Sequence, residues 1–158
     1  MLLRNILFKD NKPMAKIIRR SLEEFNAAKP GTVYFDPTTD CLTDIFVIPR
    51  SAYFVIDING EIVGGAGYFP TNGLPENVCE LVKLYVDKKY RGNGCGQTLL
   101  EKCIHDAKRD GFKKMYIESL PELSNAISLY KKNGFNFIEH SLGNSGHNGC
   151  DIWMLKDL

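Results

Sequence analysis

The stretch Tyr85–Cys103, YVDKKYRGNGCGQTLLEKC, places three glycines within five residues, between a strand-like run and an amphipathic run. These glycines are Gly92, Gly94 and Gly96, and Arg91 directly precedes them. Glycine adopts positive φ without steric cost and lets a bound group approach the backbone without meeting a Cβ. Where a helix then begins, its free N–H groups and its dipole favour an anion. The segment therefore indicates a strand–turn–helix unit that holds an anionic group such as a diphosphate.

Two well-known phosphate-binding motifs do not fit this turn. The dinucleotide-binding pattern G-x-G-x-x-G needs a third glycine where Gln97 stands, and it belongs to a first βαβ unit rather than to the middle of a chain. The pattern G-x-x-x-x-G-K-[ST] needs a lysine that does not follow Gly96. A plain turn is the alternative interpretation. The glycine cluster at a strand-to-helix junction favours a diphosphate-binding turn over a plain turn.

Composition narrows the class of protein. With 158 residues, 44% hydrophobic and 25% charged, the chain suits one soluble globular domain over 1–158. A formal net charge of +1 gives no reason to expect nucleic acid as a partner. We read no signal peptide and no apolar run of the roughly 20 residues that a membrane helix needs, so no membrane partner is expected. The 5 cysteines form no C-x-x-C pair, which indicates free thiols and a cytoplasmic location.

Hydrophobic periodicity predicts a mixture of helices and strands. Helical spacing over 12–25 predicts an opening helix, and prolines and glycine then break the chain, with a short helix near 39–46. Two β-rich runs flank Asn59-Gly60, which favours a type I′ hairpin because both turn residues need positive φ. A helix follows the glycines and stops at Gly111, and Ser124 is the expected N-cap of the next one, over 124–135. The expected strands are 52–58, 61–69, 78–86, 113–120, 135–142 and 150–158. This order predicts an α/β fold with a central sheet.

The turn and its neighbours resemble one enzyme family. Arg91–Gly96 matches the R/Q-x-x-G-x-G/A signature of the GCN5-related N-acetyltransferases (GNAT). Residues 81–112 resemble the family's central strand, pyrophosphate loop and following helix, and 116–139 resemble its next strand, its N-A-x-x-L-Y-x-x-x-G-F helix and the strand after it. The resemblance spans about 52–158. It implies the GNAT fold, a layered α+β arrangement in which helices flank a mixed, mostly antiparallel sheet with splayed central strands.

The same resemblance implies acetyl-CoA as co-substrate and no metal. Leu84, Tyr85 and Val86 would bind the pantetheine arm through their backbone, as if the arm were an added strand. This requires a bulge near Tyr85 and separation from the neighbouring strand. Asn125, which opens the later helix, matches a position that often contacts the cofactor. The residues implied to bind the pyrophosphate are Arg91, Gly92, Asn93, Gly94, Cys95 and Gly96, with Gln97 and Thr98 as further donors.

Acyl transfer to an amine by direct attack in a ternary complex needs an acid for the departing thiolate. Tyr130 resembles the family tyrosine that lies near the cofactor sulfur, so it is expected to bind the cofactor and to act as this acid. A phenol with a pKa of about 10 can donate to a thiolate of similar basicity. A core aromatic on the helix face of Ile127 and Leu129 is the alternative. The backbone N–H of Val86 is, by resemblance, the donor to the developing oxyanion.

The incoming amine needs a base, and Glu80 at the start of the central strand is the candidate. A carboxylate in a cleft can have a raised pKa and accept a proton directly or through water. An exposed charge at the start of a strand is the alternative, and Glu118 is a second candidate base. Strand alternation predicts that one face carries Glu80, Val82, Leu84 and Val86.

The sequence gives the least information about the acceptor. The resemblance places it between about 17–35 and 142–151. The adjoining loop 31–40 offers Tyr34, Asp36 and Asp40, of which the two carboxylates could hold an ammonium group, and solvated loop charge is the alternative. His147 borders this region, and we expect a surface histidine; with His140 and Cys150 it is spaced too loosely for a zinc pattern. We expect the primary amine of a small or amino-acid-like molecule. A protein lysine or N-terminal amine, and a non-catalytic acetyl-CoA sensor, are the alternatives, and a homodimer is left open.

Overall fold

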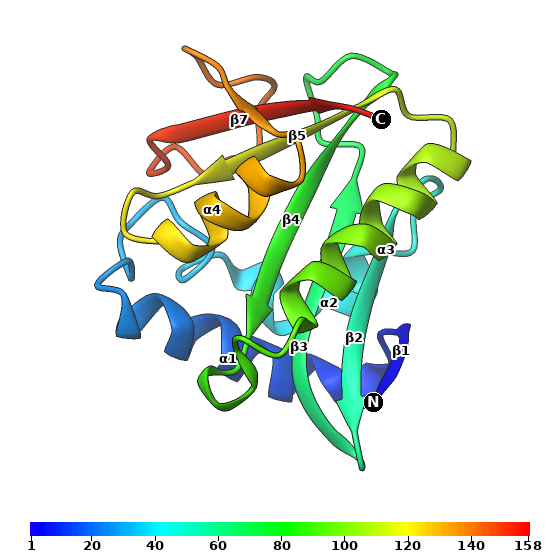
Figure 1. Ribbon diagram of the computed structural model, residues 1–158, viewed down its shortest axis with the longest axis vertical. Coiled ribbons are helices and arrows are strands. Elements are labelled where there is room, and N and C mark those ends of the chain that lie inside the picture. Colours follow the sequence, from blue (N-terminus) through cyan, green and yellow to red (C-terminus); the bar gives the residue numbers. More distant parts are fainter.

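A twisted sheet of seven strands, in the order β1-β2-β3-β4-β5-β7-β6, forms the centre of the computed structural model, which describes residues 1–158 (Figure 1). Only β4 and β5 run parallel, and every other neighbouring pair is antiparallel. The expectation of a mixed, mostly antiparallel sheet is therefore confirmed. The strands are β1 (Leu2–Asn5), β2 (Ala52–Ile58), β3 (Glu61–Phe69), β4 (Val78–Val86), β5 (Lys114–Ser119), β6 (Asn136–Phe137) and β7 (Ile152–Asp157).

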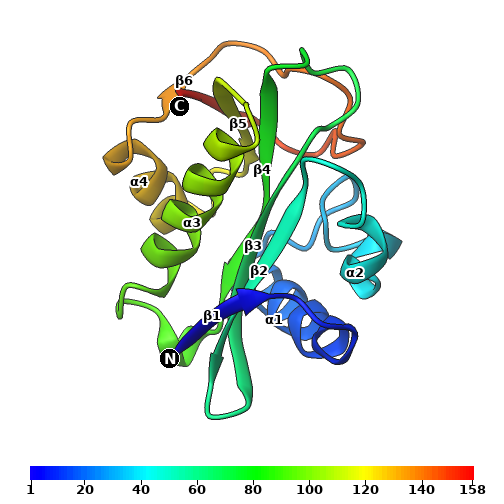
Figure 2. The ribbon, with the colours of Figure 1, turned by 90° about the vertical axis from the view of Figure 1, so that its right-hand side faces the viewer.

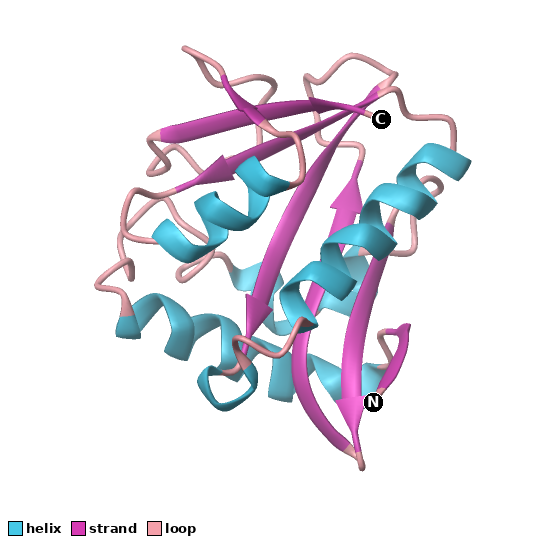
Figure 3. Cartoon of the chain, viewed as in Figure 1, coloured by secondary structure: helices cyan, strands magenta, loops and turns pink.

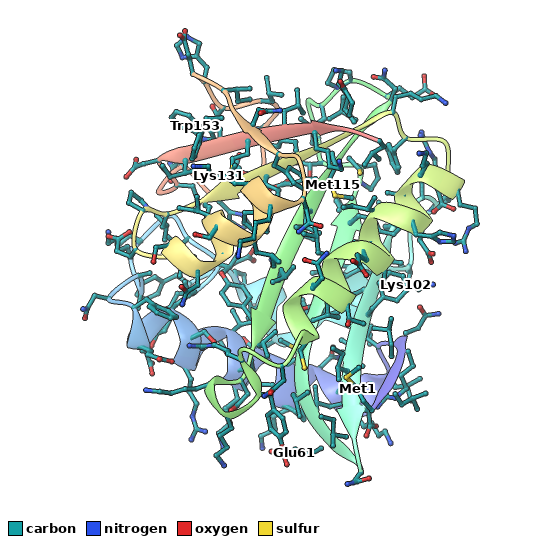
Figure 4. The ribbon with its side chains drawn as sticks, viewed as in Figure 1. Met1, Glu61, Lys102, Met115, Lys131 and Trp153 are labelled. Carbon is teal, nitrogen blue, oxygen red and sulfur yellow. The ribbon has the colours of Figure 1, made fainter.

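Helices cover both faces of the sheet. They are α1 (Asn11–Glu24), α2 (Leu42–Ile45), α3 (Cys95–Arg109) and α4 (Ser124–Lys132). Figure 2 shows α3 and α4 on one face and α1 and α2 on the other, and Figure 3 shows the long loops that connect them. Each face has its own apolar core; Met115 (Figure 4) is completely buried in the larger one, under α3 and α4. None of these helices has the length and apolar character that crossing a membrane demands.

The sequence predicted the middle of the sheet better than its edges. The strands expected at 52–58, 61–69 and 78–86 are confirmed at both ends. The sequence interpretation missed β1, a short edge strand that pairs with β2. The strand expected over 135–142 is wrong beyond Phe137, because only Asn136 and Phe137 pair with β7. Ser124 was also misplaced by one position: it is the first residue of α4, and no side chain caps this helix.

A bulge interrupts β4 where the resemblance required one. Gly65 pairs with Tyr85, but Gly67 pairs with Val82, so the one residue between the glycines faces two residues of β4. Lys83 lies in this bulge with φ 51°, an uncommon value for a residue with a side chain. The hydroxyl of the buried Tyr53 donates to the carbonyl of Lys83 at 2.8 Å, and this hydrogen bond helps to hold the bulge in place.

The bulge reverses which face of β4 points to the core. Cys79 and Leu81 lie in the core under α3, and beyond the bulge it is Val86 that lies there. Glu80 points away from that core, so the prediction that Glu80 and Val86 share one face is wrong. Ideal alternation holds only within an unbroken strand, and the extra residue shifts its phase by one.

Next to the bulge, β4 and β5 separate. Their parallel pairing covers only Val78–Glu80 against Lys114–Tyr116, while β4 continues to Val86 (Figure 1). The expected splay of the central strands is confirmed. Beyond Glu80, the side of β4 that faces β5 has no strand partner, and this opening positions the site.

Candidate active site

A cleft of about 610 Å³ lies between the far half of β4, the glycine turn and α4. It is lined by backbone and side chains from all three, together with the end of α1. Of the predicted cofactor residues, those that line it are Leu84, Tyr85, Val86, Arg91, Gly92, Gly94, Gly96, Gln97 and Asn125. The structure thus brings together nine predicted residues that span the chain from β4 to α4.

Positive φ explains the glycines of the turn. Gly92 and Gly94 have φ of 78° and 80°, and a Cβ at either position would meet no other atom. Their requirement is therefore conformational, since residues with side chains rarely adopt this region. Gly94 directly precedes α3, and no side chain caps that helix. Its first N–H groups are thus available to an anion in the cleft.

Arg91 ties the turn to the rest of the molecule. Its Nε donates to the carbonyl of Val86 at 2.9 Å, and its terminal nitrogens reach Glu24 at 3.0 Å and Ser21 at 3.1 Å on α1. The guanidinium also lies 5.0 Å from the ring centroid of Phe25. These contacts hold the turn, β4 and α1 in one arrangement, so the side chain acts as a positioning group beside the cleft.

Four predicted cofactor residues do not line this cleft. Asn93 is exposed, and the side chain of Cys95 is buried in the core under α3. The amide of Thr98 already donates to the carbonyl of Gly94 at 2.9 Å, as expected of the first closed turn of a helix. The fourth is Tyr130, which packs in the same core with its ring 5.9 Å from that of Phe135. Its hydroxyl makes no hydrogen bond, and burial raises its pKa, so the phenol stays protonated at neutral pH.

The cleft also contains groups that the sequence interpretation missed. Lys132, at the end of α4, and Ser21 and Phe25, at the end of α1, contribute to its wall. No local motif marks them, because they reach the cleft only through the packing of their helices.

A second cleft, of about 540 Å³, opens on the other side of β4. Its wall combines loop residues 31–38, the start of β4 and the loop before β7, and aromatic rings of Phe35, Phe46 and Phe69 form its apolar part. Of the carboxylates and phenol predicted for the acceptor, only Asp36 lies here. Asp40 instead pairs with Arg19, and the Tyr34 hydroxyl donates to Glu23 at 2.5 Å.

Glu80 lies at the bottom of this second cleft and is only 4% exposed. Burial raises the pKa of its carboxyl to about 7, and the neighbouring Glu118 pushes it in the same direction. The Thr71 hydroxyl, which donates to Glu80 Oε2 at 2.5 Å, opposes this rise. The alternative of an exposed strand-start charge is therefore wrong, and Glu80 can exchange a proton near neutral pH.

Three ionisable groups, Glu118, His147 and Lys83, lie close enough to Glu80 to affect its pKa. The hydroxyls of Tyr116 and Ser145 donate to the two oxygens of Glu118, at 2.9 and 2.7 Å. His147 Nε2 lies 2.9 Å from Asp36 Oδ2, and this contact is the largest cause holding the pKa of Asp36 well below its usual range. The expectation of a surface histidine is wrong, because the His147 side chain is only 16% exposed.

Glu80, Glu118 and His147 also bring one ligand atom each within 4.8 Å of one another. This set of carboxylates and an imidazole has the chemistry to hold a divalent cation such as Zn²⁺, after a small closure. No spacing in the sequence pointed to it, since the three residues come from β4, β5 and the loop before β7.

A chamber of about 50 Å³ lies between the two clefts. Glu80 and His147 line both the chamber and the second cleft, and Tyr85 lines both the chamber and the first cleft. Glu118 lines the chamber alone. Reacting groups held in the two clefts would therefore meet beside Glu80 and Tyr85.

Comparison with known proteins gives a consistent result. The model of the "Acetyltransferase (GNAT) family" matches residues 15–135. The chain is 36% identical over 157 residues to "Uncharacterized N-acetyltransferase YjgM" of Escherichia coli (strain K12), covering 99% of this chain and 94% of that protein. A GNAT-family acetyltransferase from Staphylococcus aureus Mu50 shares the fold with a TM-score of 0.86 at 22% identity, over 99% of this chain and 98% of that one. PaiA N-acetyltransferase of Thermoplasma acidophilum, solved in complex with coenzyme A, does so with a TM-score of 0.78 at 19% identity, over 99% and 98%. The chain belongs to the GNAT family and is an N-acetyltransferase that uses acetyl-CoA.

Proposed function

We propose that residues 1–158 form one acetyltransferase domain that moves the acetyl group to the primary amine of a small, amino-acid-like molecule, by direct attack in a ternary complex. The observation that carries this proposal is the chamber that joins the two clefts beside Glu80. A thioester reaching it from the first cleft and an amine reaching it from the second would lie in contact. Holding both reactants in this way lowers the barrier by as much as about 7–11 kcal/mol.

Three features support the binding of acetyl-CoA in the first cleft. The uncapped N-terminus of α3 and the turn at Gly92 and Gly94 accept the pyrophosphate. The unpaired edge of β4 at Leu84–Val86 accepts the pantetheine amides. Asn125 and Lys132 supply further polar contacts from α4.

Glu80 acts as the general base. The acceptor arrives as an ammonium ion, and the Glu80 carboxylate takes one of its protons, directly or through a water molecule. The freed amine forms a bond to the acetyl carbon, and the C–S bond then breaks. The nitrogen loses its second proton, which replaces the one that the general acid gives to the departing thiolate. A carboxyl with a pKa of about 7 is suited to this exchange at neutral pH.

Tyr130 acts as the general acid that protonates the departing thiolate. Its buried phenol remains protonated and has no protein acceptor for its proton. Tyr130 follows Ala126 and Leu129, which line the first cleft, on the same helix. Tyr85 is the neighbouring alternative donor, because burial raises the pKa of its phenol and nearby Tyr130 adds to that rise.

A cytoplasmic location also belongs to this proposal. All five cysteines are free, which suits a reducing compartment.

Release of CoA from acetyl-CoA, followed with a panel of amines, amino acids and peptides, tests the function. We expect turnover with small amines, and mass spectrometry should find one acetyl group on the amine nitrogen. Turnover restricted to protein lysines or N-terminal amines would replace the small-molecule acceptor with a protein one. Binding of acetyl-CoA without turnover across the whole panel would favour the sensor alternative.

A further inference from the structure

Lys83 is a buried cation whose hydrogen-bonding capacity is largely unused. Its side chain is 7% exposed, and its Nζ makes a single ion pair, at 3.3 Å, with Asp36 Oδ2. An ammonium group carries three N–H donors, and buried polar groups are normally satisfied. Lys83 therefore keeps donors for a partner that the chain itself does not supply.

The pairing with Asp36 does not account for this lysine. Asp36 already receives the Thr38 amide at 2.9 Å, the Thr38 hydroxyl at 2.6 Å and the His147 ring nitrogen at 2.9 Å. The contact with Lys83 is the longest of the four. Asp36 thus already has three polar contacts that do not involve Lys83.

The bulge is what brings Lys83 to the second cleft. Residues three apart in a regular strand point to opposite faces, so Lys83 would lie across the sheet from Glu80. The bulge, in which Lys83 has a positive φ, shifts the alternation of side chains along β4 by one residue. The side chains of Glu80 and Lys83 therefore both line the second cleft and the chamber. Strained conformations of this kind gather at functional sites.

The second cleft therefore carries charges of both signs. Glu80 and Glu118 offer carboxylates at the chamber, and Lys83 offers an ammonium group on the same strand. Apolar surface completes the wall, with the rings of Phe46 and Phe69 5.5 Å apart and Phe35 61% exposed nearby. A ligand with an ammonium group, an anionic group and an apolar body matches all three features.

We propose that Lys83 forms a carboxylate subsite, and that the acceptor is an α-amino acid, or a closely similar zwitterion, with an apolar or aromatic side chain. The amino group faces Glu80, the carboxylate binds the Lys83 ammonium, and the side chain lies on the phenylalanine surface. This assignment rests on the proposed function, because it identifies the acceptor of that reaction.

A matched pair of acceptors tests the subsite. L-Phenylalanine and phenethylamine differ by the carboxylate alone, and acetylation of each is followed as kcat/KM with saturating acetyl-CoA. We expect L-phenylalanine to be preferred about 10- to 100-fold, because this is the gain in affinity that a buried charge-assisted hydrogen bond typically provides. Lys83→Met should abolish the preference by lowering the value for L-phenylalanine far more than the value for phenethylamine, and Lys83→Arg should restore part of it.

Lys16→Met is the matched control, because Lys16 is an exposed lysine on α1 that makes no ion pair. It should leave the preference unchanged. Equal rates for the two acceptors in the wild type, or a preference for spermidine over both, would overturn the zwitterion assignment while leaving acetyl transfer to a small primary amine intact. A preference that survives in Lys83→Met would overturn the role of Lys83. Absence of turnover and of calorimetric binding for every amine would overturn the proposed function together with the subsite.

Discussion

At the scale of single residues, the two proposed proton-transfer groups differ in how the fold prepares them. Several neighbours tune the pKa of Glu80. A hydrogen bond from Thr71 and the nearby His147 and Lys83 lower this pKa, whereas Glu118 raises it. Tyr130 has no such balance of partners: burial is the main cause that raises the pKa of its phenol, and Cys103 adds to the rise. A base that must exchange protons near pH 7 needs balanced neighbours, whereas an acid that must stay protonated needs only a dry environment.

Glu80→Gln should lower kcat by about 100-fold or more, because the amide cannot accept a proton. In the wild type, kcat should rise with pH through about 7, since the carboxyl must lose its proton to act as a base. In Glu80→Gln this rise should disappear. The measurement is a pH–rate profile with acetyl-CoA saturating, and a profile with an unchanged rise near pH 7 would move the base elsewhere, with Glu118 as the next candidate.

Tyr130→Phe should lower kcat by about 100-fold or more while leaving the affinity for acetyl-CoA unchanged, because the ring is retained and only the donor is lost. Single-turnover kinetics and calorimetry separate the two quantities. Tyr85→Phe is the matched control, since it removes the neighbouring phenol. A full rate in Tyr130→Phe together with a slow Tyr85→Phe would transfer the acid to Tyr85.

At the residue scale, the sequence could name candidate site residues only where a motif was local. The signature at Arg91–Gly96 and the start of the central strand at Glu80 could both be read from short segments. Lys83 and His147 could not, because the first depends on a bulge that only strand pairing reveals and the second on a contact with Asp36, 111 positions away. Long-range packing decides which polar side chains share a cleft.

At the scale of elements, the glycine turn and the hairpin turn use the same backbone conformation for different purposes. Gly94 has φ of 80° and opens into the first cleft, whereas Gly60 has φ of 89° in the β2–β3 turn. Neither position is crowded. Substituting each glycine in turn therefore distinguishes the conformational cost of a side chain at positive φ from the loss of an anion-binding site.

Gly94→Asp should weaken CoA binding by at least about tenfold, because its carboxylate would stand where the pyrophosphate is proposed to lie. Gly60→Asp should carry a similar conformational cost, of order 1 kcal/mol, and retain full binding. Calorimetric titration of CoA into both folded variants makes the comparison. Equal affinities in the two variants would contradict the placement of the pyrophosphate.

The elements themselves were predictable to different degrees. Asn59-Gly60 and the apolar run before the glycines were sufficient for β2, β3 and β4. The edge strands were not, since β1 has four residues and β6 has two, and such short segments carry too little periodic signal. Their pairing is determined by the strand beside them rather than by their own residues.

At the scale of the whole molecule, the first cleft is bordered by α1, β4, the glycine turn and α4, which are far apart in the sequence. The chain of contacts through Arg91 joins α1 to the turn, and the amides of Gln97 and Asn133 exchange hydrogen bonds of 2.8 and 2.9 Å that join α3 to the end of α4. Binding in this cleft therefore involves both faces of the sheet.

Saturating CoA should consequently stabilise the entire fold. At a concentration 100 times the dissociation constant, the free energy of unfolding should rise by about 2.7 kcal/mol, which raises Tm by roughly 5–10 °C for a chain of this size. Thermal unfolding with and without CoA measures this rise. The Gly94→Asp variant should show a much smaller shift, and an equal shift in that variant would indicate binding outside the proposed cleft.

The separation of β4 from β5 has a consequence for the protein without its cofactor. Beyond Glu80, one edge of a central strand ends in peptide groups that no neighbouring strand satisfies. Unpaired strand edges are where other chains attach during aggregation, and proteins usually cover or interrupt them. In this fold the proposed cover is the co-substrate itself. The colloidal stability of the enzyme should then follow the supply of CoA, so that a cell short of the cofactor would lose enzyme as well as substrate.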